Sequence, residues 1–169
     1  MTFVPVPVER PGGRCIEDKT PPSPDDIVVV EGYERAIPMH RLAADAWAAL
    51  TAAARRAGHD APLFLPVSGY RTVDEQAWLW QGALAKYGDP EVACLWVARP
   101  GTSAHQSGRA IDLHLGDPIE SEYADRMRAS SAYSWLAANA AAFGFYPYDV
   151  EPWHWEYNPP WRVSAGVGE

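Results

Sequence analysis

Two polar segments lie far apart in the chain, and together they constrain its fold more than any other feature. The first, Ser103–Asp112, reads Ser-Ala-His-Gln-Ser-Gly-Arg-Ala-Ile-Asp, and the second, Glu151–Glu156, reads Glu-Pro-Trp-His-Trp-Glu. Each adjoins a run that reads as a β-strand, Arg109–Leu115 and Trp153–Tyr157. If these two segments meet in the fold, they bring two histidines and two carboxylates to one place.

The residue types in these segments suit a zinc ion with a general base beside it. Zinc binds imidazole nitrogen and carboxylate oxygen, and a catalytic site has three protein ligands and one position left for water. His105 and Asp112 are seven residues apart, which suits a loop residue and a strand residue joined by the tight turn that Gly108 permits. His154 supplies the distant ligand.

The spacing alone leaves two choices open. Asp112 and His114 share one face of the expected strand, so His114 is a rival ligand. Glu151, three residues before His154, is placed to take a proton from a zinc-bound water and pass it to a leaving amine. Glu156 alternates with His154 and is the competing base.

The bulk properties exclude some classes of partner. The formal net charge is −8, and the longest basic run is Arg55-Arg56. Phosphate binding needs clustered Lys and Arg, so a nucleic acid partner is not expected. No run of about 18 apolar residues predicts a membrane span. The first residues do not read as a secretory signal, and Cys15 and Cys94 permit a disulfide without requiring one, so the export route and redox compartment stay open.

The chain of 169 residues has the size of one domain, and we expect a monomer. Residues 1–26 are rich in proline and predict an extended N-terminal arm, with the folded domain over 27–169. The pattern predicts an α+β fold, with helices packed on a small, mainly antiparallel sheet. The expected helices are 39–57, a segment from Thr72 to Gly88 with Trp78, Leu79 and Ala83 facing inward, and 131–142; further strands are expected at 27–31 and 63–67.

Three motifs in order resemble one known group. They are Ser103-x-His105-x-x-Gly108-x-Ala110-x-Asp112, Glu151-x-Trp153-His154, and Ser68-Gly69-Tyr70-Arg71-Thr72-x-x-x-Gln76. Over roughly residues 27–158 the chain resembles zinc D-alanyl-D-alanine carboxypeptidases of the VanY type. That group includes VanX dipeptidases, phage L-alanyl-D-glutamate endolysins and the hedgehog signalling domain.

The resemblance implies a hedgehog/DD-peptidase-like fold and one zinc ion held by His105, Asp112 and His154. It implies Glu151 as the general base, and so favours Asp112 over His114 and Glu151 over Glu156. It places Arg71 in the cleft, where a guanidinium can hold a carboxylate or a developing oxyanion. Further substrate contacts are expected from Ser103, Gln76, Tyr70 and Trp153.

The implied substrate is the peptide stem of bacterial peptidoglycan, with a D-alanyl-D-alanine carboxypeptidase as the expected activity. Three alternatives stay open: an L-alanyl-D-glutamate endopeptidase, as in a phage endolysin or injected effector; a non-catalytic zinc-stabilised binding module; and a structural component of a phage tail or secretion assembly. The presence of Glu151 favours an enzyme over the binding module. The expected site of action is the periplasm or cell wall.

Overall fold

The computed structural model of the protein describes residue 16 and residues 18–159. Most of the predicted N-terminal arm therefore lies outside the described residues, as does Cys15. Within the described part, no helix is both long enough and apolar enough to span a bilayer.

A four-stranded antiparallel sheet, in the order β3-β4-β6-β5, forms the centre of the fold. Its strands are β3 (Pro66–Ser68), β4 (Ala110–Leu113), β5 (Phe145–Tyr148) and β6 (Glu151–Tyr157). Strands β4 and β6 are hydrogen-bonded neighbours, and their register sets Asp112 directly opposite His154. The two polar segments of the sequence thus meet, because adjacent antiparallel strands carry them.

A second, two-stranded sheet packs beside the first. It pairs β1 (Ile27–Glu31) with β2 (Ala36–His40) in antiparallel register, and β2 lies against β3. The contact is close at Gly69, where an added Cβ would overlap the Pro38 carbonyl oxygen and lie 2.7 Å from Cγ2 of Ile37. A glycine is therefore needed where the chain leaves β3.

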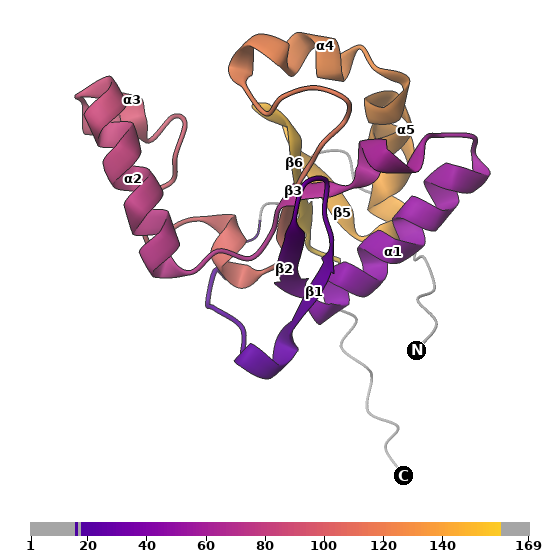
Figure 1. Cartoon of the computed structure of the whole chain (residues 1–169), viewed down its shortest axis with the longest axis horizontal. Coiled ribbons are helices and arrows are strands. Elements are labelled where there is room, and N and C mark those ends of the chain that lie inside the picture. Colours follow the sequence, from indigo (N-terminus) through magenta and orange to yellow (C-terminus); the bar gives the residue numbers. More distant parts are fainter. Residues whose placement is uncertain (1–15, 17, 160–169) are drawn as a thin grey trace.

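Helices cover the sheet and close the main core (Figure 1). Helix α1 (Arg41–Arg56) buries Trp47, whose Nε1 donates to the Phe64 carbonyl at 2.9 Å. The other helices that contribute to this core are α4 (Ala124–Arg128), α5 (Ser131–Asn139) and the 3-10 turn η5 (Ala140–Phe143). The prediction of an α+β fold with helices on a small antiparallel sheet is confirmed.

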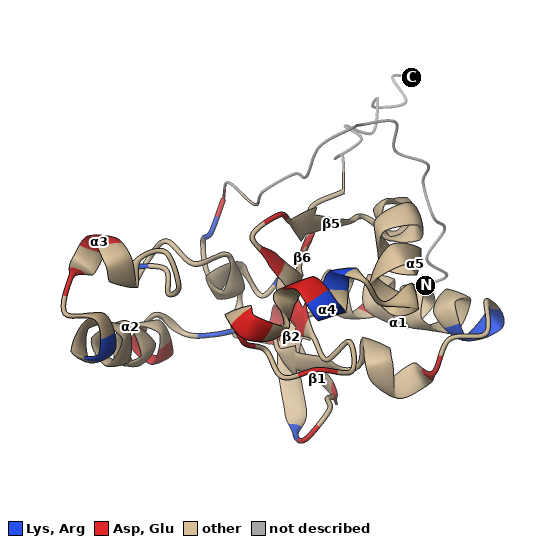
Figure 2. Ribbon diagram, turned by 90° about the horizontal axis from the view of Figure 1, so that it is seen from above, with Lys and Arg blue, Asp and Glu red and all other residues tan. Residues whose placement is uncertain are grey.

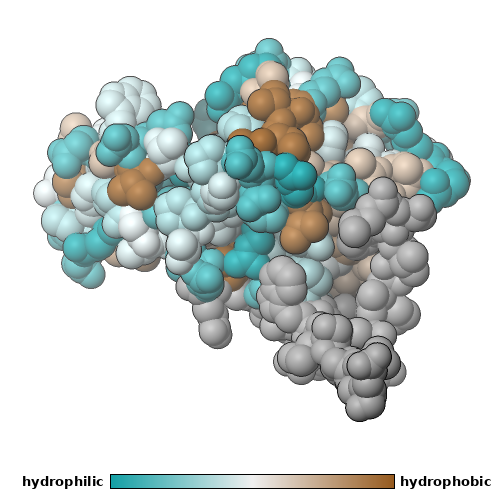
Figure 3. Space-filling model, turned by 90° about the horizontal axis from the view of Figure 1, so that it is seen from below, coloured by the Kyte–Doolittle hydropathy of each residue, from teal (hydrophilic) through white to brown (hydrophobic). Residues whose placement is uncertain are grey.

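Helices α2 (Val73–Tyr87) and α3 (Pro90–Ala93), with the chain to Val97, form a helical lobe that stands apart from the main core (Figures 1 and 3). This lobe has a small core of its own, made by Trp80, Ala83 and Ala93. Helix α2 starts with the predicted capping box of Thr72 and Glu75, and Gly88 ends it with a φ of 72°. The lobe thus packs around its own small core and forms a wall beside the sheet.

Three details of the sequence prediction are wrong. Trp78 is 76% exposed, and the buried tryptophan of α2 is Trp80 instead, because the helix packs only on the small lobe core. The expected strand over 63–67 begins as a 3-10 turn, η2 (Ala61–Phe64), with a proline near its start. The strand expected over Arg109–Leu115 is shorter, since β4 spans only Ala110–Leu113, the part of the run that pairs with β3 and β6.

Charged residues are dispersed over the described surface. Figure 2 shows acidic residues, in red, both on the helical lobe and on the elements of the main body, with basic residues, in blue, in small groups between them. The remaining short turns are η1 (Pro24–Asp26), η3 (Ala104–Ser107) and η4 (Ser121–Tyr123). Of these, η3 carries the first histidine of the polar segments.

Candidate metal centre

The local sequence sets His105 at the start of a short turn. Ser103 caps η3, and its Oγ accepts a hydrogen bond from the His105 backbone N–H at 3.3 Å. Gly108 ends the turn with a φ of 68°, a conformation that L side chains rarely adopt. Its carbonyl accepts from the His40 backbone N–H at 2.8 Å, which ties the turn to the end of β2.

Donor atoms of His105, Asp112 and His154 lie within 4.8 Å of one another, and all three residues are buried. Asp112 bridges the two rings: its Oδ2 is 3.3 Å from Nε2 of His105, and its Oδ1 is 2.9 Å from Nδ1 of His154. The sheet register and the η3 turn therefore bring together the three residues that the resemblance implies as ligands.

The outward nitrogen of each ring has its own acceptor. Nδ1 of His105 is 2.7 Å from the Gly69 carbonyl oxygen, and Nε2 of His154 is 3.1 Å from Oε1 of Glu156. An acceptor at the outward nitrogen holds a proton there, so the nitrogen that faces the cluster is the one available to a metal ion once it has lost its own proton. Two imidazole nitrogens and one carboxylate that converge in this way fit a zinc ion.

His114 lies away from this cluster. Strand β4 ends at Leu113, so the alternation that would set His114 beside Asp112 stops before it. Its ring instead stacks on Tyr33, with the ring centroids 3.5 Å apart. The sequence could not resolve this choice, because the end of the strand is set by its pairing with neighbours.

Within the cluster, the Asp112 carboxylate and the histidine rings offset the cost of burying one another's charge. Burial alone would raise the pKa of Asp112, but the adjacent His105 and His154 outweigh burial and hold it far below its usual range. Burial would likewise lower the pKa of His154, but hydrogen bonds to Asp112 and Glu156 raise it to about 10. These shifts favour an ionised Asp112 beside a protonated His154, so metal binding requires release of the histidine proton.

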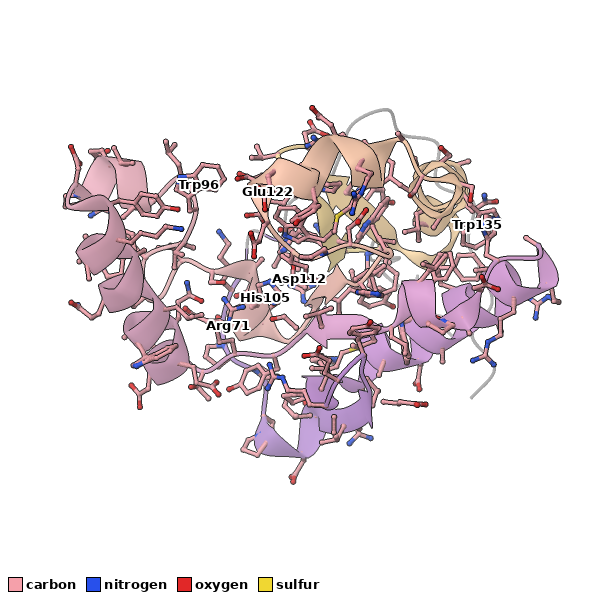
Figure 4. The ribbon with its side chains drawn as sticks, turned by 45° about the horizontal axis from the view of Figure 1, so that its top comes forward. Arg71, Trp96, His105, Asp112, Glu122 and Trp135 are labelled. Carbon is pink, nitrogen blue, oxygen red and sulfur yellow. The ribbon has the colours of Figure 1, made fainter. Side chains whose placement is uncertain are left out.

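The cluster opens onto a cavity of about 820 Å³ between the sheet and the helical lobe. Among the predicted site residues, its lining includes Arg71, Gln76, Ser103, Glu151 and Trp153, together with the cluster itself. Figure 4 shows Arg71, His105 and Asp112 side by side, with Trp96 coming from the lobe and Glu122 from the side of α4. Tyr70 is half-buried and is not among the lining residues.

The guanidinium of Arg71 is held in place by two neighbours. Its Nη1 donates to Oε1 of Gln76 at 2.8 Å, and its Nη2 donates to Oγ of Ser68 at 3.0 Å. Gln76 is buried and in turn donates to the Ala98 carbonyl at 2.6 Å. Gln76 therefore connects the arginine to the helical lobe, and Ser68 is a contact that the sequence reading missed although its motif contained that residue.

Glu151 begins β6 and is half-buried in the cavity wall. Burial, and then the nearby Asp112 carboxylate, raise its pKa, although His154 and Arg71 act in the opposite direction. A carboxyl group with a raised pKa beside a metal cluster is suited to accept a proton and return it. Glu156 differs, since it lies behind His154 and contacts the outward nitrogen of that ring.

The fold and the cluster define a class: single-domain α+β proteins of the peptidase type, with a His-Asp-His group at the floor of an open cavity. Within that class, the chain belongs to the VanY family, described as D-alanyl-D-alanine carboxypeptidase, whose family model matches residues 36–160.

Known proteins agree with this assignment. The chain is 36% identical over 109 residues to a D-alanyl-D-alanine carboxypeptidase of Enterococcus faecalis, a match that covers 53% of this chain and 38% of that protein. The chain spans about half, or less, of the length of the curated relatives that it matches.

Two solved structures are similar along most of the chain. The LdcB LD-carboxypeptidase aligns with a TM-score of 0.65 and 28% identity, covering 80% of this chain and 69% of that one. The vancomycin-resistance D,D-pentapeptidase VanY, in a variant form in complex with Zn(II), aligns with a TM-score of 0.56 and 29% identity, covering 82% of each chain.

Proposed function

We propose that the protein is a zinc metallopeptidase that hydrolyses the peptide stem of bacterial peptidoglycan, as a D-alanyl-D-alanine carboxypeptidase. One observation carries this proposal: a buried His-Asp-His cluster shares its cavity with a half-buried glutamate and an anchored arginine. The family match and the carboxypeptidase relatives support the choice of substrate. The site of action is then the periplasm or cell wall.

In this proposal His105, Asp112 and His154 hold one zinc ion. Bound there, zinc polarises a carbonyl and lowers the pKa of a bound water towards 7. The Zn(II) complex of the similar VanY structure supports the choice of metal. Ser103 supports the site indirectly, since its hydroxyl caps the turn that carries His105.

Glu151 acts as general base and then as general acid. Its carboxylate takes the proton of the attacking water and returns it to the amine of the departing residue. Its raised pKa supports the uptake of the proton, because such a carboxylate accepts a proton more readily than an ordinary one. No covalent intermediate with a protein side chain is required.

Arg71 binds the substrate. A guanidinium offers five N–H donors, and two of its nitrogens already donate to Gln76 and Ser68. The remaining donors are available for a carboxylate or for the negative charge that develops on the carbonyl oxygen. Gln76 acts through Arg71, while Trp153 forms part of the cavity wall and of the main core.

A second candidate concerns the bond that is cut. The similar structure with a TM-score of 0.65 is an LD-carboxypeptidase, which supports hydrolysis after an L-residue instead of between two D-alanines. The family match favours the D,D bond. Both activities release one terminal residue, so they share the roles assigned to Glu151 and Arg71.

The test is to incubate the zinc-loaded protein with defined pentapeptide and tetrapeptide muropeptides and identify the products by mass spectrometry. Loss of one alanine from the pentapeptide supports the D,D-carboxypeptidase, and loss from the tetrapeptide alone supports the LD-carboxypeptidase. Cleavage after the first L-alanine indicates the endopeptidase. No cleavage of any stem, with zinc bound, contradicts the proposed enzyme and favours a binding module.

A further inference from the structure

Glu156 is a buried carboxylate that the catalytic roles above do not use. It is 7% exposed and lies two residues after His154 on β6, so both side chains point to the same face. Its Oε1 is 3.1 Å from Nε2 of His154, and its Oε2 accepts a hydrogen bond from the backbone N–H of Ile16. Both oxygens are thus engaged, on opposite sides of the carboxyl group.

The contact with His154 determines how that ring meets the metal cluster. A carboxylate can only accept, so Nε2–H of His154 donates to Glu156, and the Nδ1 proton that faces Asp112 is the one that a bound metal ion would replace. At His105 the Gly69 carbonyl has the equivalent position, behind the opposite ring nitrogen. The two rings therefore have matching supports, one from the backbone and one from Glu156.

Ile16 fixes the carboxylate from the other side. Its side chain is 1% exposed, and the residue lines the cavity that holds the cluster. Nearby in the sequence, the Asp18 carbonyl accepts a hydrogen bond of 3.1 Å from Nη2 of Arg109. Arg109 directly precedes β4, and its own carbonyl accepts from the backbone N–H of Tyr157 on β6.

We propose that Glu156 and the backbone N–H of Ile16 are positioning groups of the metal centre, so that the segment before β1 completes the site. This inference rests on the proposed zinc site. Ile16 lies outside residues 36–160, the part of the chain that the family model matches. The segment before β1 thus adds a support to a ligand that the matched region carries.

The first test compares zinc affinity in two variants with the same chemical change. Glu156→Gln keeps the shape of the side chain, but an amide has one acceptor oxygen and one donor nitrogen, so it cannot accept from both His154 and Ile16. Glu151→Gln removes one charge from the same strand without touching a ligand ring. Zinc dissociation constants are measured on the full chain by competition with a chromogenic chelator.

We expect Glu156→Gln to weaken zinc binding about 10–100-fold, the usual effect of losing a group that supports a metal-bound histidine. Glu151→Gln is expected to stay within about 3-fold of the wild type. The Co(II)-substituted Glu156→Gln protein should also show a shifted visible absorption spectrum, because the geometry around His154 changes. Equal affinities in the Glu156→Gln and wild-type proteins would overturn the role of Glu156.

The second test separates the backbone donor of Ile16 from its buried side chain. Ile16→Ala removes packing and keeps the N–H, whereas Ile16→Pro removes the N–H. We expect the proline variant to bind zinc about 10-fold more weakly than the alanine variant, with circular dichroism verifying that both are folded. Equal affinities in these two variants would overturn the role of the backbone donor.

The outcomes also separate this inference from the proposed function. These measurements need no substrate, so they test the metal centre alone. A wild-type protein that binds no zinc would contradict both the proposed function and the positioning role of Glu156 and Ile16. Wild-type binding with unchanged affinity in all of the variants would overturn only the positioning role and leave the proposed peptidase intact.

Discussion

The two glutamates of β6 have different surroundings, and different roles follow from them. Glu151 lies in the cavity wall, where burial raises its pKa, and in the proposed mechanism it moves protons. Glu156 lies behind His154, with both oxygens engaged by protein groups. A carboxylate that is fully engaged cannot also reach a substrate, so the geometry favours Glu151 as the base.

Replacing Glu151 by Ala is expected to leave zinc bound while turnover collapses. General acid–base groups contribute about 10²–10⁴-fold, so kcat should fall by that factor on a stem pentapeptide. The zinc content of the purified variant should stay at one ion per chain, because Glu151 is not one of the clustered residues. Atomic absorption and steady-state kinetics provide the two readouts. Near-normal turnover in this variant would contradict the proposed role.

Gln76 is expected to affect catalysis through Arg71. Gln76→Leu leaves Nη1 of Arg71 and the carbonyl of Ala98 without their present partner. Hydrogen bonds to charged groups are worth about 1.5–3 kcal/mol, so kcat/KM should fall at least about ten-fold. The matched control is Gln81→Leu, the same change at an exposed position of the same helix. An equal loss in both variants would point to a general effect on α2 instead.

The sequence could predict the clustered donors because two motifs carry them, His105 and Asp112 in one and His154 in the other. It could not choose between Asp112 and His114 by spacing, because that depends on where the pairing of β4 ends. The support from Ile16 to Glu156 was beyond sequence reasoning, since it joins residues 140 positions apart without any motif. Residues that a motif carries are therefore easier to predict than contacts between residues far apart in the sequence.

At the scale of helices and strands, the ends of a helix were predicted well where capping residues mark them. The capping box of Thr72 and the left-handed Gly88 fix the two ends of α2 through local hydrogen bonds and backbone conformation. Strand β2, which contains Pro38, was missed, because its stability comes from pairing with β1 and not from its own residues. Local signals predict boundaries, whereas pairing depends on the rest of the fold.

Two glycine-to-alanine changes are expected to have opposite effects on stability. Gly69→Ala forces a Cβ against Pro38 and Ile37, which should cost about 1–3 kcal/mol. Gly82→Ala, in α2 with nothing within 4 Å of the added Cβ, should stabilise by about 0.5–1 kcal/mol. Urea unfolding curves measure both. A stable Gly69→Ala protein would show that β2 and β3 can separate without cost.

For the whole molecule, the cavity lies where three parts of the fold meet. The main sheet supplies Asp112, Glu151 and His154; the η3 turn supplies His105; and the helical lobe, with its own small core, supplies Gln76 and the wall around Trp96. A metal ion bound at the cluster joins the η3 turn to β4 and β6. Metal binding and folding should therefore be thermodynamically coupled.

Removing zinc is expected to lower the thermal stability of the protein without unfolding it, because the main core is extensive and does not include the cluster. A ligand at 100 times its dissociation constant stabilises by about 2.7 kcal/mol, and for a chain of this size that corresponds to a Tm shift of about 5–10 °C. Differential scanning calorimetry with EDTA and then with excess zinc measures the shift. His154→Ala, which removes one of the three proposed ligands, should show little of it. A wild-type Tm that EDTA and zinc leave unchanged would contradict the coupling, because an ion that bridges η3, β4 and β6 must favour the folded state.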